Sequence, residues 1–338
     1  MNKVVINGFG RIGRLVFRLL ANDPNFEVVG INDLSDPETL AYLLKYDSAQ
    51  GNFLINDITH DENNIIVKGT KVPIFAHADA GECPWRKLGV DLVFECSGFY
   101  TSRNKAIKHI EAGAKKVIIS APADEDMPTI VYSVNEQILT GDEDIISTAS
   151  CTTNCLAPIV NILNNKFGIK KGLMTTVHAY TNDQSTLDVA HGKGITSRRG
   201  RAAAGNIVPT STGAAKAIGL VIPELNEKLD GIAYRVPILT GSVVDLAVEL
   251  KNDTTAEAVN AALKEHQTTS MRVTDDPIVS SDIIGSYFAS VVDADLTTVL
   301  DTESGQLVKV VSWYDNEMGY VAQMIRTAKY WLNKSKLD

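Results

Sequence analysis

The six residues GFGRIG, at positions 8–13, stand between an apolar, strand-like run and a segment with apolar residues at helical spacing. A strand, a glycine-rich turn and a helix in this order are typical of the first unit of a dinucleotide-binding sheet. Gly8 permits the tight turn, Gly10 lets the backbone approach a pyrophosphate, and Gly13 lets helix and strand pack closely. The helix N-terminus then offers N–H groups to the phosphates, so the motif predicts dinucleotide binding.

The rest of the first half repeats the alternation of strand and helix. Apolar runs at 26–33, 90–98 and 114–122 are typical of buried parallel strands, because almost every residue in them is apolar. The helix at 11–23 connects the first two strands. Residues 1–150 are therefore predicted to form a doubly wound (Rossmann) α/β domain.

The second half has longer strands, several of which alternate between apolar and polar residues. They are expected at 172–181, 241–250, 285–293 and 306–315. Alternation indicates a sheet with one face covered, here in a mostly antiparallel arrangement. Helices are expected at 254–267 and 319–334. The pattern predicts a second, α+β catalytic domain at 151–315, so the chain as a whole is α/β with two domains.

Asp33 ends the second predicted strand, twenty residues after Gly13. A carboxylate at this point can accept hydrogen bonds from both ribose hydroxyls, and its charge repels a 2′-phosphate. The expected cofactor is therefore NAD rather than NADP.

Composition excludes several other classes of protein. The net charge of −9 over 338 residues argues against nucleic acid as the main partner, because phosphate neutralisation needs a basic surface. No run approaches membrane-spanning length, and the N-terminus has no pattern of an export signal. Four cysteines are too few for a disulfide scaffold, which favours a reducing, cytoplasmic setting. No metal site is expected.

The segment STASCTTNCLAP, at 147–158, surrounds a cysteine with small hydroxyl side chains. A helix is expected to begin here, with Ser150 as its N-cap and Cys151 in its first turn. The helix dipole favours the thiolate at this position, so Cys151 is the candidate nucleophile. Cys155, one turn further on, is interpreted as a small buried residue that packs in the core and has no catalytic role.

A thiol nucleophile needs a base, and His178 is the candidate. It lies within the apolar strand LMTTVHAYT and is flanked by threonines. A histidine close to a reactive cysteine is the expected partner in thiol catalysis. The sequence therefore predicts that His178 and Cys151 form a pair.

With these motifs, the chain resembles the phosphorylating, glycolytic glyceraldehyde-3-phosphate dehydrogenases. Eight matching segments follow the family's order along nearly the whole chain: INGFGRIGR (6–14), INDL (31–34), KYDS (45–48), ASCTTNCLAP (149–158), MTTVHAYTNDQ (174–184), STGAAKA (211–217), RVP (235–237) and SWYDNEMGY (312–320). The segment containing SCTTN is among the most specific of these. Cys151 corresponds to the family's nucleophile.

The resemblance implies a reaction in two stages. Cys151 attacks the aldehyde of glyceraldehyde 3-phosphate to give a thiohemiacetal, and His178 accepts its hydroxyl proton as hydride passes to NAD. Inorganic phosphate then attacks the resulting thioester to give 1,3-bisphosphoglycerate.

The resemblance also assigns binding residues. The cofactor is expected at the backbone of Arg11 and Ile12, at Ser120 and at Asn316, in addition to the glycine motif and Asp33. The substrate's own phosphate is expected at Thr181 and Arg235. The attacking phosphate is expected at Ser150, Thr152, Arg199, Thr212 and Gly213, and Arg198 or Arg201 is the alternative to Arg199.

The resemblance further implies a homotetramer, with the loop at 75–85 packed between subunits. It implies that residues 316–338 form a C-terminal helix that returns to the NAD-binding domain. Val189 and Ala190 stand where NAD-using members usually carry Leu-Pro, so Asp33 is the main basis for expecting NAD. Two alternatives stay open: an erythrose-4-phosphate or semialdehyde dehydrogenase of the same architecture, and a secondary surface or RNA-binding role.

Overall fold

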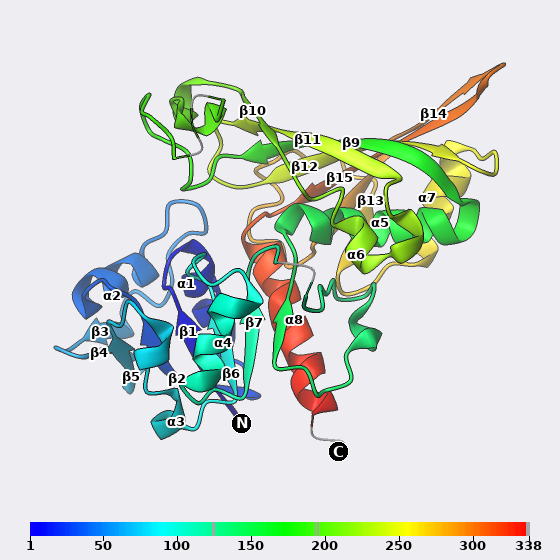
Figure 1. Cartoon of the computed structure of the whole chain (residues 1–338). Helices are drawn as coiled ribbons and strands as arrows, with labels where there is room; N and C mark the ends of the chain where they lie inside the picture. The colour runs from blue at the N-terminus through cyan, green and yellow to red at the C-terminus, as the bar shows by residue number, and fades with distance from the viewer. Residues whose placement is uncertain (124–125, 193, 195, 336–338) are drawn as a thin grey trace. The chain divides into compact units, whose positions relative to one another are not determined.

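The computed structural model describes residues 1–123, 126–192, 194 and 196–335. The chain divides into two compact units. The first unit contains Met1–Ile130, Glu136–Ala149 and Met324–Asp338, and the second contains Val131–Asn135 and Ser150–Gln323. The last helix is thus divided between the units, with its later part in the first. Figure 1 shows the elements of each unit.

The first unit is built on an eight-stranded sheet. Its elements are β1 (Asn2–Asn7), α1 (Arg11–Leu20), β2 (Phe26–Asn32), α2 (Pro37–Lys45), β3 (Ile58–His60), β4 (Asn64–Val67), β5 (Thr70–Phe75), η1 (Ala80–Glu82), α3 (Trp85–Leu88), β6 (Leu92–Glu95), α4 (Arg103–Glu111), β7 (Lys116–Ile119), η2 (Glu136–Ile138) and β8 (Ile145–Ser147). The strand order is β3-β4-β5-β2-β1-β6-β7-β8. The pairs β3–β4 and β4–β5 are antiparallel, and the other pairs are parallel.

The parallel part of this sheet, β5-β2-β1-β6-β7-β8, has the doubly wound order of a dinucleotide-binding domain. From β1 the chain builds outward to β2 and β5 on one side, and then to β6, β7 and β8 on the other. The direction of winding therefore reverses at β1 and β6, and ligands of such sheets bind at the carboxyl ends of the strands at that point. The predicted fold class of the first half is confirmed.

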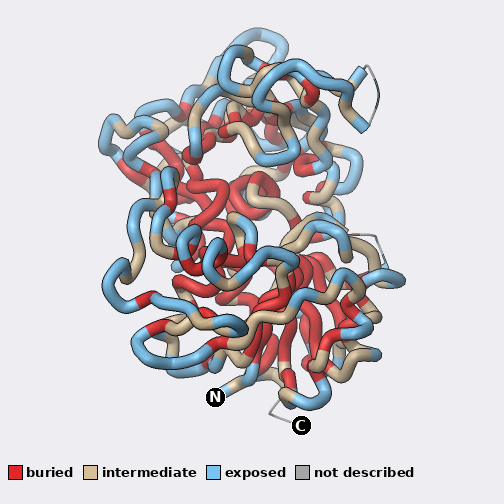
Figure 2. The backbone as a smooth tube through the Cα atoms, turned by 90° about the vertical axis from the view of Figure 1, so that its left-hand side faces the viewer, coloured by how far each residue is buried: buried red, intermediate tan, exposed pale blue. Residues whose placement is uncertain are grey.

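Burial explains why these strands are apolar nearly throughout. Val4, Val5 and Ile6 in β1 are fully buried, as are Val93 and Phe94 in β6. Figure 2 shows buried segments side by side in the interior of the lower part of the view, with exposed segments around them. A parallel sheet covered on both faces leaves no position for an exposed polar residue in its central strands.

The turn between β1 and α1 depends on glycine at two positions. Gly8 has φ +87, and a Cβ there would lie 2.6 Å from the Cα of Ser97. A Cβ on Gly13 would lie 2.1 Å from the carbonyl oxygen of Gly8, so α1 could not approach the strand as closely. Gly10, by contrast, faces open space, because no described atom outside its immediate surroundings lies within 4 Å of the point that a Cβ would occupy.

The end of α8 (Met318–Lys334) packs within the first unit. Trp331 is fully buried, and its indole N–H donates to the Glu143 carboxylate at 3.0 Å. The ammonium of Lys116 lies 4.4 Å from the centre of the Trp331 ring and donates to the carbonyl oxygens of Gly141 and Glu143. These contacts fix the C-terminal segment to the loop before β8.

The second unit is a seven-stranded, mostly antiparallel sheet with helices on one face. Its elements are α5 (Cys151–Phe167), β9 (Ile169–Ala179), η3 (Arg198–Gly200), η4 (Ala203–Gly205), β10 (Val208–Ser211), α6 (Ile218–Val221), η5 (Pro223–Leu225), β11 (Leu229–Val236), β12 (Ser242–Leu250), α7 (Ala256–Glu265), β13 (Met271–Thr274), β14 (Ser290–Thr302), β15 (Gly305–Tyr314) and the start of α8. The strand order is β10-β11-β9-β12-β15-β14-β13, in which β11–β9 and β13–β14 pair in parallel and the other pairs are antiparallel.

Helix α5 covers one face of this sheet, packing on β9, β12, β14 and β15 (Figure 1). Along β12, buried residues alternate with half-buried ones. The buried residues therefore lie on one face of the sheet and the half-buried residues on the other. Val244, Leu246 and Val248 point toward the helices and are fully buried. The expected α+β second half with a mostly antiparallel sheet is confirmed.

Candidate active site

In the first unit, the predicted cofactor residues meet at the carboxyl ends of β1 and β2. The Asp33 carboxylate accepts the backbone N–H of Phe9 at 2.7 Å with one oxygen, and that of Ser35 at 3.0 Å with the other. Gly8 donates its N–H to the carbonyl oxygen of Asn32 at 2.8 Å. Asp33 therefore lies directly beside the glycine turn. A carboxylate accepts about four hydrogen bonds, so it keeps capacity for ribose hydroxyls.

Arg11 begins α1, and its side chain is held by Asp47. The guanidinium donates to the Asp47 carboxylate at 2.6 Å, and that side chain is 1% exposed. Burial opposes ionisation of Asp47, but hydrogen bonds from Arg11, Gln50 and Ala49 outweigh it and lower its pKa. The Arg11 side chain is thus held at the start of α1, and Ile12 is the next residue of that helix.

Ser120 directly follows β7 and donates its N–H to the carbonyl oxygen of Glu95 at 3.0 Å. It therefore lies at the same carboxyl edge as the glycine turn. Two exposed apolar residues at this edge were missed by sequence reasoning: Leu34, which is 70% exposed, and Phe99, which is 75% exposed. The signal in the sequence was a large apolar residue in the loop after a strand, two residues beyond β2 for Leu34 and four beyond β6 for Phe99.

In the second unit, Cys151 and His178 are brought together as predicted. Ser150 caps α5, because its hydroxyl oxygen accepts the N–H of Thr153 at 3.1 Å. Cys151 is the first residue of the helix, and its Sγ lies 3.4 Å from Nε2 of His178 in β9. His178 is 3% exposed, so this contact is largely shielded from water.

Burial favours the uncharged form of both side chains. It raises the pKa of the Cys151 thiol, although the charge of Arg235 and the donors of Thr152 act against it. It lowers the pKa of His178 to about 3, and the charge of Arg235 acts in the same direction. Arg235 therefore stabilises a thiolate on Cys151 and opposes an imidazolium on His178.

Nδ1 of His178 lies between a backbone carbonyl and the Arg235 guanidinium. Nδ1 lies 2.7 Å from the carbonyl oxygen of Ala179, which can only accept a hydrogen bond. Nδ1 also lies 2.8 Å from the guanidinium of Arg235, a donor, but that group has another acceptor in the same carbonyl at 3.2 Å. With the ring proton on Nδ1, the carbonyl accepts that proton, and the guanidinium donates to the same carbonyl and to Thr181. Nε2 then presents its lone pair to Cys151, as a general base requires.

Two arginines and a threonine gather beside this pair. Arg235 donates to the hydroxyl of Thr181 at 3.3 Å, Thr181 donates to Asp183, and Arg199 pairs with Asp183. Among the described residues, the buried Nε of Arg235 has no hydrogen-bond partner. A buried guanidinium donor without a partner is costly, and an anion would satisfy it.

Arg199 is the arginine of its loop that reaches this cluster. Its side chain is 22% exposed, whereas that of Arg201 is 64% exposed and pairs with Asp188. Arg198 is exposed. The loop thus supplies one partly buried guanidinium, which pairs with the same Asp183 that accepts the hydroxyl of Thr181.

The remaining phosphate candidates lie near the start of α5. Thr153 donates its hydroxyl to the carbonyl oxygen of Ala214 at 3.3 Å, which joins the helix end to Thr212 and Gly213. The hydroxyl of Thr212 accepts the N–H of Ala214 at 3.2 Å. The start of α5 and the Thr212–Gly213 turn therefore form one cluster of hydroxyl and backbone groups.

The hydroxyl of Thr152 points into the interior, where it meets Tyr314 at 2.8 Å. The same Tyr314 hydroxyl meets Thr176 at 2.8 Å, and its ring packs edge-on against His178 at 5.9 Å. Tyr314 is 1% exposed. Sequence reasoning missed this residue, although it lies within the SWYDNEMGY segment. It links α5 to the strand that carries His178.

Asn316 is held by its side-chain oxygen. That oxygen accepts the hydroxyls of Ser242 at 2.8 Å and Thr240 at 3.3 Å, and the residue is 6% exposed. The amide NH₂ group is consequently the end of the side chain that remains to donate to a ligand.

Two further findings concern the described part of the chain. It contains no group of three or more His, Cys, Asp or Glu side chains that could hold a metal ion. None of its helices has the length and apolar character needed to cross a bilayer.

A doubly wound sheet with an aspartate beside its glycine turn, and a thiol–imidazole pair flanked by arginines, define a nicotinamide-dinucleotide-dependent dehydrogenase. Comparison with known proteins agrees. The NAD binding domain of glyceraldehyde 3-phosphate dehydrogenase matches residues 2–103, and the C-terminal domain of that family matches residues 150–316. The chain belongs to the glyceraldehyde-3-phosphate dehydrogenase family, and it is an NAD-dependent oxidoreductase.

Full-length relatives support this assignment. The chain is 56% identical over 336 residues to glyceraldehyde-3-phosphate dehydrogenase of Clostridium pasteurianum, covering 99% of this chain and 100% of that protein. It is 54% identical to the protein of the same name from Clostridium acetobutylicum, with the same coverage. It is 53% identical to that from Streptococcus pyogenes, covering 99% of each. These findings do not favour the alternative substrates or a primary surface or RNA-binding role.

Proposed function

We propose that this chain oxidises D-glyceraldehyde 3-phosphate in glycolysis and couples the oxidation to phosphorylation, giving 1,3-bisphosphoglycerate. The observation that carries the proposal is the 3.4 Å contact between Sγ of Cys151 and Nε2 of His178, at the start of a helix and beside the Arg235 guanidinium. A nucleophile, a base and an anion-binding group stand together, as acyl transfer through a thioester requires.

In the first stage, His178 takes the thiol proton and Sγ of Cys151 bonds to the aldehyde carbon. The aldehyde oxygen receives that proton, which completes the thiohemiacetal. His178 then takes the hydroxyl proton while the carbon loses hydride, and a thioester remains on Cys151. NAD, when bound, supplies the acceptor for that hydride.

In the second stage, an oxygen of inorganic phosphate bonds to the thioester carbon and the bond to sulfur breaks. Cys151 leaves as a thiolate, which recovers a proton from His178. The charge of Arg235 makes the sulfur a better leaving group, because it lowers the pKa of that thiol. The product is an acyl phosphate, so the energy of oxidation is kept in a transferable group.

Both stages need anion pockets. We assign Thr181 and Arg235 to the phosphate of the substrate, on the basis of the unsatisfied buried Nε of Arg235. We assign the attacking phosphate to Ser150, Thr152, Thr212, Gly213 and Arg199. The proximity of Arg199 to Thr181 supports an arrangement in which both pockets share this guanidinium.

The cofactor is assigned to the carboxyl edge of the parallel sheet, at Gly8, Gly10, Arg11, Ile12, Gly13, Asp33 and Ser120, with Asn316 at the carboxamide. The open space at Gly10 supports close approach of a pyrophosphate. The exposed side chains of Leu34 and Phe99 offer apolar surface for the adenine ring, which has two apolar faces.

We further propose that the chain acts in the cytoplasm as a homotetramer. The face of the seven-stranded sheet opposite α5 supports self-association, because it carries exposed Leu173, Leu300 and Leu307. These residues line a shallow hollow of about 710 Å³. Apolar patches of this kind usually mark an interface. The tetramer is tested by measuring the molar mass of the protein in solution. A molar mass of one chain contradicts the proposed tetramer but leaves the proposed reaction unaffected.

The experiment that tests the reaction is a steady-state assay of aldehyde oxidation with and without inorganic phosphate. We expect acyl phosphate to form from glyceraldehyde 3-phosphate only when phosphate is present. Formation that is independent of phosphate contradicts the second stage. Higher kcat/KM for erythrose 4-phosphate or a semialdehyde contradicts the choice of substrate.

A further inference from the structure

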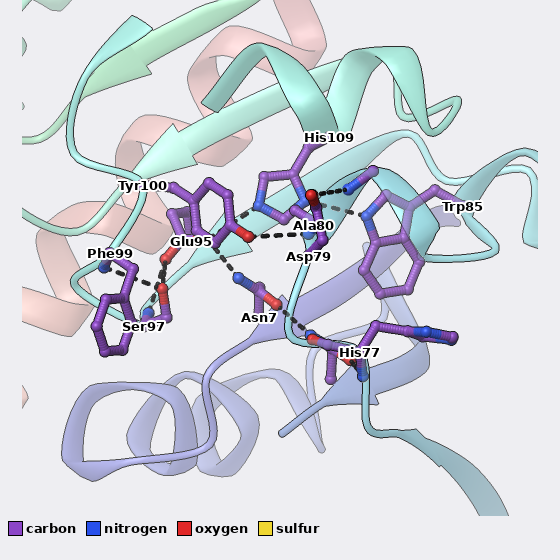
Figure 3. A network of polar contacts seen from close by, with 12 residues as sticks. Asn7, His77, Asp79, Ala80, Trp85, Glu95, Ser97, Phe99, Tyr100 and His109 are labelled. Carbon is purple, nitrogen blue, oxygen red and sulfur yellow. Dashed lines mark hydrogen bonds and ion pairs between the residues drawn. The ribbon is translucent and has the colours of Figure 1, made fainter. Parts of the chain in front are cut away.

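A carboxylate is buried beneath the carboxyl edge of the parallel sheet. Glu95 ends β6, is 1% exposed and receives four hydrogen bonds. One oxygen accepts from Nδ2 of Asn7 at 2.6 Å and meets Nε2 of His109 at 2.9 Å. The other accepts the N–H of Ser97 at 2.7 Å and its hydroxyl at 2.5 Å. Figure 3 shows these groups converging on Glu95.

Trp85 determines which ring nitrogen of His109 is the acceptor. The indole Nε1 of Trp85 lies 3.0 Å from Nδ1 of His109, and an indole N–H can only donate. Nδ1 must therefore hold a lone pair, so the single ring proton lies on Nε2 and points at Glu95. His109 is 0% exposed, and its ring packs between those of Trp85 and Tyr100 (Figure 3). Trp85 and Glu95 together therefore fix the tautomer and the orientation of this imidazole.

A backbone amide fixes the other side of the network. The N–H of His77 donates to Oδ1 of Asn32 at 2.9 Å, so the NH₂ group of Asn32 must face the other way. That group donates to Oδ1 of Asn7 at 2.7 Å and to the carbonyl oxygen of His77 at 2.9 Å. Asn7 consequently turns its own NH₂ toward Glu95. The chain of donors from both sides therefore ends on this one carboxylate.

The residues held in this way are those that build the dinucleotide cradle. Asn7 ends β1 and precedes Gly8, and Asn32 ends β2 and precedes Asp33. Ser97 follows β6, and its hydroxyl oxygen accepts the N–H of Phe99 at 3.2 Å. The ends of three adjacent strands are thus connected through one side chain.

We propose that Glu95 is a positioning residue for the dinucleotide: as a buried carboxylate, held by His109, it fixes the ends of β1, β2 and β6 against one another. The proposal rests on the assignment of the cofactor to the glycine turn and Asp33. Glu95 itself is buried and acts through Asn7 and Ser97. Its removal therefore weakens cofactor binding without touching the thiol chemistry of the second unit.

Glu95→Gln is a sharp test, because it changes an oxygen into an NH₂ group of the same size. In one orientation the new NH₂ faces Asn7 and His109, and in the other it faces the N–H of Ser97. In either orientation the NH₂ group of the glutamine, which is a donor, faces groups that are themselves donors. The wild-type carboxylate accepts four hydrogen bonds from these groups, and the variant loses part of them. The strand ends lose their common acceptor, while the volume in the core is unchanged.

The matched control is Val93→Ala, in the same strand. Val93 is fully buried, so its truncation lowers stability without altering the polar network. For each variant, NAD affinity is measured by calorimetry together with Tm, kcat and KM for NAD. The rate of Cys151 alkylation without NAD shows whether the second unit is intact.

We expect Glu95→Gln to raise the Kd for NAD by about tenfold or more, with kcat at saturating NAD within about twofold of wild type. We expect Val93→Ala to lower Tm by a similar or larger amount with Kd unchanged. Equal effects of both variants on Kd at equal loss of Tm overturn the proposal. So does an unchanged Kd in Glu95→Gln.

Trp85→Phe provides a second test that does not depend on the folding of Glu95→Gln. The ring remains, but the indole donor to Nδ1 of His109 is lost, so this nitrogen becomes free to bind a proton. In ¹⁵N-histidine spectra near neutral pH, we expect one wild-type histidine, assigned by its absence in His109→Gln, to carry its proton on Nε2 and a lone pair on Nδ1. In Trp85→Phe we expect this histidine to show protonation of Nδ1 as well. A proton on Nδ1 in the wild type overturns the proposal.

Asp33→Ala separates this proposal from the assignment on which it rests. A weaker NAD affinity in Asp33→Ala with an unchanged affinity in Glu95→Gln contradicts the positioning role alone. An unchanged affinity in Asp33→Ala contradicts the location of the cofactor and with it the positioning role.

Discussion

The Sγ of Cys151 lies 3.4 Å from Nε2 of His178, and Nδ1 of the same ring lies 2.7 Å from the carbonyl oxygen of Ala179. In the tautomer that donates to this carbonyl, the basic nitrogen faces the sulfur. Burial favours a thiol beside a neutral imidazole in the resting site. The nearby Arg235 charge then favours the thiolate once a proton is transferred.

Replacement of the nucleophile is the first prediction. Cys151→Ser is expected to lower dehydrogenase turnover by a factor of at least ~10⁴, because a serine hydroxyl at this position is not deprotonated by one histidine alone. Cys155→Ala is the matched control, since Cys155 is fully buried one turn away. It is expected to lose some stability and keep its activity. Turnover that survives in Cys151→Ser contradicts the covalent mechanism.

The four thiols are expected to differ in reactivity. Burial raises the pKa of Cys83 and of Cys155 to about 12, and it also raises that of Cys96. Cys151 has a base within hydrogen-bonding reach and a guanidinium that favours its thiolate. Limited treatment with iodoacetamide near neutral pH, followed by peptide mass spectrometry, should find the label on Cys151 first.

Loss of the base should slow this labelling. In His178→Asn we expect alkylation of Cys151 to fall at least about tenfold at neutral pH, because the thiol then loses its proton acceptor. Labelling of Cys83 or Cys155 before Cys151 in the wild-type protein contradicts the difference in thiolate character.

The buried His178 should also make stability depend on pH. Its pKa is about 3 in the folded protein against an ordinary 6.5, mainly because of burial. Between these values the unfolded chain binds a proton that the folded chain does not. Folding stability therefore falls as pH decreases from about 6.5 toward 3, and this contribution is fully restored above 6.5.

The measurement is the urea midpoint of the wild type and of His178→Gln across that pH range. We expect the variant to lose less stability on acidification, since glutamine does not titrate, and all other titrating groups are shared. Parallel curves contradict a buried neutral imidazole at this position.

The substrate's phosphate should depend on Arg235. Arg235→Lys keeps the charge but loses the planar pair of donors, and Nε is the donor that has no partner among the described residues. We expect kcat/KM for glyceraldehyde 3-phosphate to fall about 100-fold, with a much smaller change for unphosphorylated glyceraldehyde. An equal loss for both aldehydes contradicts a phosphate pocket at Arg235 and assigns the residue to the reacting carbon.

Local signals in the sequence were enough to predict the doubly wound sheet. The glycine turn, the wholly apolar strands and Asp33 each indicate the structure of the residues next to them in sequence. In a parallel sheet both faces are buried, so it is not necessary to predict which face is exposed. The pairing of Cys151 with His178 was also predictable. A thiol nucleophile needs a base, and a histidine within an apolar strand of the same domain can supply it.

Features that depend on distant partners were not predictable. The strand expected at 285–293 begins instead at Ser290 and continues as β14 to Thr302, because its pairing with β15 extends it. The strands β3 and β4 were missed, since they are short and pair only with each other and β5. Tyr314 was missed because its contacts, Thr152 and Thr176, lie more than a hundred residues away in sequence.

The choice of dinucleotide should depend on Asp33. Its carboxylate lies at the end of β2, where Phe9 and Ser35 orient it through their backbone N–H groups. In Asp33→Ala the charge that repels a 2′-phosphate is lost, together with an acceptor for the ribose hydroxyls. We expect the preference for NAD over NADP, as a ratio of kcat/KM values, to fall by at least about tenfold, through weaker use of NAD and better use of NADP.

Asp36→Ala is the control, because this nearby carboxylate caps α2 and does not contact the glycine turn in the described contacts. An unchanged ratio in Asp33→Ala shifts the discrimination to another part of the chain, for which Val189 is the first candidate to replace.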